Sequence, residues 1–117
     1  MLLIIREPAT PEQIIAMLGE NDFYIKCVVD LERLILAGGG RLHADAEGEL
    51  LAAGSLQDNL WGSSWSPYTQ EIIYESMVNI RPYQNRSMQI LDETVRVRVK
   101  AIMNHLLGGQ QCKTLFL

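Results

Sequence analysis

Hydrophobic residues along this chain fall into short runs, and the spacing within each run predicts a strand or a helix. The apolar run near the N-terminus predicts a short strand over residues 2–6. The next run predicts a helix over 11–19. Thr10 can cap this helix, Pro11 suits its first position and Gln13 can complete a capping box. The first two elements are therefore expected to be a strand and a helix.

Two hairpins are predicted in the middle of the chain. Residues 23–30 alternate and are rich in β-branched side chains, and the apolar pattern resumes at 34–37 after only a short turn. Farther along, apolar and aromatic segments over 61–65 and 71–80 flank a turn over 66–70. We expect this second hairpin to be the longer one.

The spacing of apolar residues over 42–53 fits both a strand and a helix. Every second residue from Leu42 is apolar or small, as in a half-buried strand. The same segment fits a helix, because Leu42, Ala46 and Leu50 recur at helical spacing and Gly54 can end the element. Alanine and glutamate favour the helical alternative, and we adopt it.

The last apolar stripe predicts a long helix near the C-terminus. Valines alternate with basic residues over 95–100, as in a strand, but the apolar stripe from Leu91 to Leu106 continues at helical spacing for four turns. Asp92 can cap the helix, and Gly108 can help to terminate it.

Together these elements predict an α+β fold. We expect a mainly antiparallel sheet of four or five strands with about three helices, packed on one side by the first and last helices. A length of 117 residues, with 48% hydrophobic and 21% charged residues, is typical of one globular domain. The prediction is a single domain over 1–117, in which 109–117 form a C-terminal tail.

Net charge and composition indicate which partners and which cellular compartment to expect. The formal net charge of −4 argues against nucleic acid and anionic membranes as partners. The chain has no apolar run long enough to span a bilayer and no pattern of a signal peptide, so a cytoplasmic location is expected. Cys27 and Cys112 have a spacing that fits neither a zinc knuckle nor a redox pair, so two free thiols are predicted.

Several separated motifs occur in one order along the chain. They are Tyr24–Asp30, Leu36–Gly40, His43–Asp45, Leu60–Gly62 and Asn79–Pro82. Together they resemble a small prokaryotic family of unknown function over roughly residues 1–108. The resemblance implies a single-domain soluble protein, and it carries no activity, cofactor or catalytic residue.

A glycine run at the end of a strand pattern is the first candidate site. Backbone amides at Gly39 and Gly40 could converge on a phosphate, and Arg41 could add a positive charge. The residues of a P-loop and of a dinucleotide-binding fingerprint do not follow. The alternative is a strand exit whose bends require glycine.

A candidate metal site follows the glycine run. On a strand, His43, Asp45 and Glu47 would project from one face and could bind a divalent metal. On a helix, only His43 and Glu47 remain neighbours. The alternative is an ordinary solvated helix face, and no cofactor is assigned beyond this candidate metal.

A loop near residue 85 supplies a third set of candidates. Arg81, Asn85 and Arg86 carry groups that suit recognition of a carboxylate or a phosphate. The same residue types also brace loops by bonding to carbonyl groups. The two sets would reinforce each other if this loop approached 38–47 in space.

Three hypotheses of function follow from these residues. The first is a non-enzymatic binding module for a small anionic ligand or a partner protein, using Gly38–Glu47 and Arg81–Arg86. The second is a metal-dependent hydrolase that uses His43, Asp45 and Glu47. The third is a structural homo-oligomer that buries the apolar tail Leu115–Leu117 or the tryptophan hairpin against a second copy.

Overall fold

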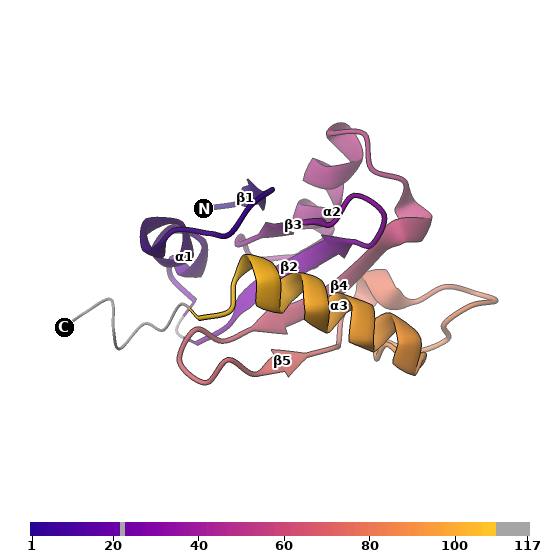
Figure 1. The fold of residues 1–117 in the computed structure, drawn as a ribbon. Helices are drawn as coiled ribbons and strands as arrows, with labels where there is room; N and C mark the ends of the chain where they lie inside the picture. The colour runs from indigo at the N-terminus through magenta and orange to yellow at the C-terminus, as the bar shows by residue number, and fades with distance from the viewer. Residues whose placement is uncertain (22, 110–117) are drawn as a thin grey trace.

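An antiparallel sheet forms the centre of the computed structural model, which describes residues 1–21 and 23–109 (Figure 1). The strands run in the order β1-β3-β2-β4-β5 and are β1 (Leu3–Ile5), β2 (Ile25–Asp30), β3 (Ile35–Gly38), β4 (Leu60–Trp65) and β5 (Ile72–Ile73). The α-helices of the described part are α1 (Pro11–Leu18), α2 (His43–Ala52) and α3 (Glu93–Leu106). Two single-turn 3₁₀ helices are η1 (Gln57–Asn59) and η2 (Met77–Asn79). These elements confirm the predicted α+β class with five strands and three α-helices.

The first and last helices form where their caps predict. At α1 the Thr10 hydroxyl accepts a hydrogen bond of 3.2 Å from the Gln13 N–H, and the Gln13 side chain accepts one of 2.9 Å from the Thr10 N–H. At α3 the Asp92 carboxylate accepts a hydrogen bond of 2.8 Å from the Thr94 N–H. Both helices therefore begin at side chains that satisfy free backbone donors.

Residues 42–53 contain a helix and not a strand. The helix α2 spans His43–Ala52, and it buries Ala46 and Leu50 one turn apart. The helical interpretation of this ambiguous segment is confirmed.

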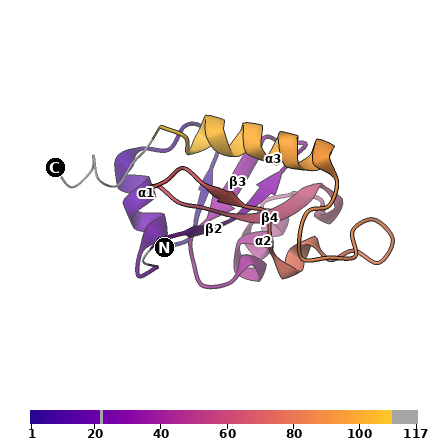
Figure 2. The ribbon, with the colours of Figure 1, turned by 90° about the horizontal axis from the view of Figure 1, so that it is seen from below.

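The helices cover both faces of the sheet (Figure 2). Side chains of α1 and α3 pack with Cys27, Leu36 and Trp65 from one face. The helix α2 packs on Val28 and Ala37 from the opposite face. The first and last helices therefore share a face, as predicted, and α2 covers the other one.

The second hairpin is shorter than predicted. The strand β5 has two residues, and the segment predicted to extend it contains η2 instead. The Ser76 hydroxyl accepts a hydrogen bond of 3.2 Å from the Val78 N–H and caps this turn. The longer hairpin is β2–β3, so the prediction about relative length was wrong.

The turn between β2 and β3 is organised by a buried acid. The Asp30 carboxylate is fully buried and accepts hydrogen bonds from the backbone N–H groups of Glu32 and Arg33. It also accepts one of 2.6 Å from the Ser55 hydroxyl. This network ties the β2–β3 turn to the chain that leaves α2.

Two further observations concern the termini and membranes. No helix in residues 1–21 and 23–109 is long and apolar enough to cross a membrane. The predicted tail beyond Gly109, with Cys112 and Leu115–Leu117, lies outside the described residues.

Candidate functional site

The glycine run forms a tight strand exit. Gly39 and Gly40 have φ angles of +100° and +76°, which side-chain-bearing residues rarely adopt. A Cβ on Gly39 would lie 2.0 Å from the carbonyl oxygen of Met1, and its N–H already donates a hydrogen bond of 2.9 Å to the Lys26 carbonyl. A strand exit whose bends require glycine therefore accounts for Gly39 and Gly40 without a bound anion.

The strand exit separates two cavities. One, which we call the strand-exit cavity, has a volume of about 410 Å³ and contains Gly40 and Arg41 in its wall. The other, which we call the α2 groove, has a volume of about 560 Å³ and begins at Leu42 and His43. Of the predicted set, Gly40 and Arg41 thus line one cavity and His43 lines the other, while Gly39 lines neither.

The α2 groove lies between the start of α2 and the segment that follows β5. Its floor contains Lys26 and Ser64, which are opposite each other on β2 and β4. His43 and Ala44 at the start of α2 form one wall. The opposite wall is largely apolar and contains Ile73, Met77, Val78 and Met88.

His43 and Lys26 form the polar end of the α2 groove. The His43 Nε2 donates a hydrogen bond of 2.6 Å to the Ser63 carbonyl, because a carbonyl can only accept. Burial lowers the pKa of His43 from its ordinary value of 6.5, and the nearby Lys26 charge lowers it further, while the hydrogen bond to Ser63 opposes both. The imidazole is therefore neutral at pH 7 and keeps Nδ1 as an acceptor. The Lys26 ammonium donates a hydrogen bond of 2.5 Å to the Arg41 carbonyl.

Large apolar side chains that line the groove are exposed to solvent. Met77 is 74% exposed and Leu42 is 58% exposed. Contiguous exposed apolar side chains mark interaction sites, and methionine adapts to ligands of varied shape. Glu75 also lines the groove, and its carboxylate accepts a hydrogen bond of 2.7 Å from the Gln89 side chain.

The structure does not gather the candidate metal ligands. On the helix α2, His43 and Glu47 are one turn apart, and Asp45 lies between them in sequence and so points elsewhere. Among the residues that the structure describes, no group of three or more His, Cys, Asp and Glu side chains could hold a metal ion. The metal hypothesis therefore receives no support from the geometry.

Arg81 is held by its own chain. Its guanidinium donates hydrogen bonds to the carbonyls of Asp58 and Leu60 and lies 3.9 Å from the centre of the Trp61 ring. Burial lowers the pKa of Arg81, and the carboxylates of Asp58 and Glu47 oppose that shift. The loop that contains Arg81 therefore approaches α2 near Glu47, and not at the glycine run.

Asn85 and Arg86 brace the same loop. Asn85 is buried, and its Nδ2 donates hydrogen bonds to the carbonyls of Asn79, Ser87 and Gln89. Its Oδ1 accepts one of 3.0 Å from the Leu91 N–H. Arg86 is exposed and donates to the Pro82 carbonyl. These contacts correspond to the bracing alternative for this loop.

Trp61 and Trp65 are buried in the core of a single chain. They are therefore not available to cover a second copy, and the tryptophan hairpin no longer supports the homo-oligomer hypothesis. The other support for it, Leu115–Leu117, lies outside the described residues.

The sequence reasoning missed most of the α2 groove. Lys26 interrupts an apolar strand, and that interruption is a signal that could have been used. Met77 and Met88 follow no period that relates them to His43, and only the folded chain brings them near it.

A family model described as "Protein of unknown function (DUF5674)" matches residues 3–106. The chain belongs to this family. The match confirms the resemblance seen in the separated motifs, and it covers every strand and α-helix described above. Comparison with curated proteins and comparison with solved structures each found no match.

Proposed function

We propose that the protein is a non-enzymatic binding module and that the α2 groove holds a small anionic ligand with an apolar part. One observation carries this proposal: a single cavity joins the Lys26 ammonium to an exposed wall that contains Met77 and Met88. An ammonium group attracts a carboxylate or a phosphate, and the exposed wall offers burial to an apolar chain or ring.

The start of α2 supports an anionic ligand. The first backbone N–H groups of a helix carry partial positive charge, and the cap residue Leu42 has no side-chain acceptor for them. His43 and Ala44, the first two residues of α2, line the groove. An anion placed there would neutralise these donors together with Lys26.

The surroundings of His43 support binding rather than turnover. The hydrogen-bond partner of its Nε2 is the Ser63 carbonyl, which cannot act as a nucleophile. The imidazole is thereby fixed in one orientation, as expected of a residue that shapes a binding site.

A cytoplasmic location is part of the same proposal. Cys27 is a free thiol in the core, and free buried thiols are typical of proteins in reducing compartments. The net charge of −4 supports a small ligand rather than nucleic acid.

The test uses octanoate as the probe and octanol as its uncharged match. We expect octanoate to shift the backbone amide signals of Ala44, Ser64 and Met77 in a ¹⁵N NMR titration, and to bind more tightly than octanol. Lys26→Met removes the charge and keeps the alkyl stem, so octanoate affinity should fall about tenfold.

Lys100→Met is the matched control, because Lys100 is exposed on α3 on the other side of the sheet. It should leave octanoate affinity unchanged. Equal affinity for octanoate and octanol, or no shift at these three amides, would contradict the proposal.

A further inference from the structure

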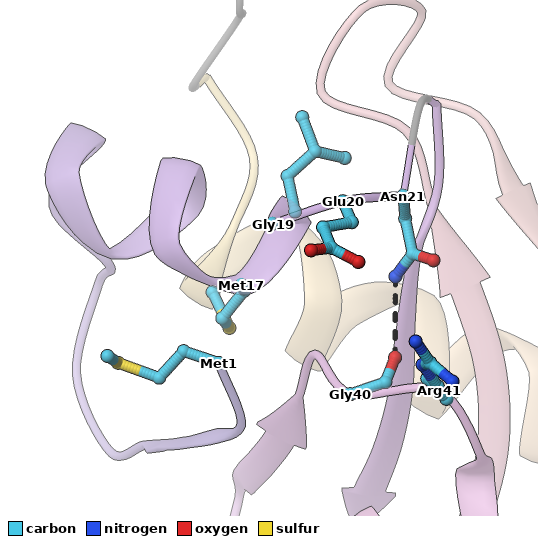
Figure 3. A pocket seen from close by; sticks show the side chains of 8 residues that line it. Met1, Met17, Gly19, Glu20, Asn21, Gly40 and Arg41 are labelled. Carbon is cyan, nitrogen blue, oxygen red and sulfur yellow. Dashed lines mark hydrogen bonds between the residues drawn. The ribbon is translucent and has the colours of Figure 1, made fainter.

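The strand-exit cavity is separate from the α2 groove and takes no part in the function proposed above. It lies between the C-terminal end of α1 and the turn that follows β3 (Figure 3). Figure 3 shows the Glu20 carboxylate on the α1 side and the Arg41 side chain on the side of the turn, with Asn21 beside them. The wall also includes Met1, which is 73% exposed, and the buried residues Met17 and Leu18.

The polar side chains of this cavity belong to Glu20, Asn21 and Arg41. Within the described residues, neither the Glu20 carboxylate nor the Arg41 guanidinium has a hydrogen-bond or ion-pair partner. Asn21 Nδ2 donates a hydrogen bond of 3.3 Å to the Gly40 carbonyl, which orients the amide and leaves Oδ1 as an acceptor. The cavity therefore presents a carboxylate and an amide oxygen near a guanidinium.

We propose that the strand-exit cavity binds a free α-amino acid with an apolar side chain. The ammonium group of such a ligand donates to the Glu20 carboxylate. The ligand carboxylate pairs with the Arg41 guanidinium, whose planar donors match a carboxylate. Its apolar side chain lies against Met1, which is 73% exposed.

A zwitterion suits this cavity better than a singly charged ligand does. A simple anion would meet the negative charge of Glu20, and a simple cation would meet the positive charge of Arg41. A ligand that carries both charges on neighbouring atoms satisfies both residues at once. The volume of about 410 Å³ is in the range of small-molecule sites.

The experiment measures binding of L-leucine, L-methionine and L-phenylalanine to the full chain by ¹⁵N NMR titration. We expect at least one of them to shift the backbone amides of Gly19, Asn21 and Gly40. L-Leucinamide, which lacks the carboxylate, and N-acetyl-L-leucine, which lacks the ammonium group, should each bind about tenfold more weakly than L-leucine. These amides are distinct from those that report octanoate, so either proposal can fail while the other stands.

Two variants test whether Glu20 and Arg41 bind the charged groups of the ligand. Glu20→Gln and Arg41→Gln should each weaken the binding of the best amino acid about tenfold. The controls Glu12→Gln and Arg6→Gln neutralise exposed charges outside the cavity and should leave affinity unchanged. The proposal is overturned if none of the three amino acids shifts these amides at millimolar concentration, or if leucine and its two blocked forms bind equally.

Discussion

The Asn79 side chain forms hydrogen bonds with Gly62 where a longer β5 would otherwise pair with β4. Continuing the register of β4 and β5 would place Gly62 opposite Glu75. Instead, the Asn79 side chain accepts a hydrogen bond of 2.7 Å from the Gly62 N–H and donates one of 2.9 Å to its carbonyl. The backbone groups of β4 are thereby paired although the chain has turned away.

The first prediction concerns Gly62, because the crossing segment lies directly on it. A Cβ at this position would lie 2.5 Å from Ser76 Cβ and 2.7 Å from a methyl group of Val78. We expect Gly62→Ala to lower the free energy of unfolding by about 2 kcal/mol or more, because the neighbours must move. Denaturation by urea measures this change.

Gly48→Ala is the matched control for this prediction. Gly48 lies inside α2, and a Cβ there would meet no atom within 4 Å. This substitution should raise stability by about 0.5–1 kcal/mol, because alanine favours the helix. Equal effects of the two substitutions would show that backbone preference, and not contact with Ser76, decides the choice of glycine.

The second prediction is a pH dependence caused by His43. Its pKa in the folded protein is below the ordinary value of 6.5, so the unfolded chain binds the proton more readily. The stabilisation that follows is present above pH 6.5 and is lost as pH falls below it toward the folded pKa. The facing charge is Lys26, which opposes protonation of the imidazole.

Urea denaturation of the wild type and of His43→Gln from pH 7.5 to pH 5 measures this effect. The wild type should lose more stability over this range than the variant does. Identical pH profiles would mean that the burial of His43 has no influence on its titration.

At the scale of elements, Asn85 makes several of the hydrogen bonds that hold the loop between η2 and α3. Asn85 satisfies three carbonyls and one N–H of this loop, and the Arg81 N–H and carbonyl also pair with the backbone of Asn85. A loop without regular structure therefore has a defined path from the sheet to the last helix.

The third prediction separates bracing from ligand recognition in this loop. Asn85→Ala should cost about 2–3 kcal/mol, because it leaves buried polar groups without partners. Arg86→Ala should cost about 0.5 kcal/mol or less, because Arg86 is exposed. Thermal unfolding of both variants tests this difference, and a larger loss for Arg86→Ala would contradict the bracing role.

At the scale of the whole molecule, helices on both faces of the sheet enclose its central strand. The strand β2 pairs with β3 and β4, and helices cover it from both faces. Cys27 on β2 is fully buried, and burial raises the pKa of its thiol to about 12. A reagent can reach this thiol only after β2 separates from the rest of the structure.

The fourth prediction uses Cys27 as a reporter of global unfolding. Iodoacetamide should modify it in the native protein only at the rate at which the whole molecule opens. Peptide mapping by mass spectrometry, which distinguishes Cys27 from Cys112, measures the rate. Fast modification of Cys27 under native conditions would show that β2 opens locally.

Several parts of the fold were predictable from the sequence because their causes are local. Thr10 and Asp92 cap helices with donors that lie two or three residues away. The β2–β3 hairpin follows from an alternating pattern around a short turn. The length of β5 was predicted wrongly. Its segment has a strand-like composition, but the point at which the strand ends depends on contacts with Gly62 on another strand.

The candidate site was predicted only in part. His43 and Arg41 were predicted to bind one ligand together, but they line different cavities. Arg81 and Asn85 were chosen for their chemistry, and that chemistry is directed at carbonyls of the same chain. Residue type indicates which bonds a group can form, and it does not indicate whether the chain itself supplies the partner.

The sequence by itself determined the first and last helices, the first hairpin and the α+β class, because caps, periodicity and short turns act over a few residues. The tertiary structure decided that α2 covers the second face, that β5 stays short and that the glycine run separates two cavities. These features depend on contacts between residues far apart in the chain, such as Lys26 with Arg41 and Gly62 with Asn79. Such contacts form only when the whole sheet has assembled, so no local pattern encodes them.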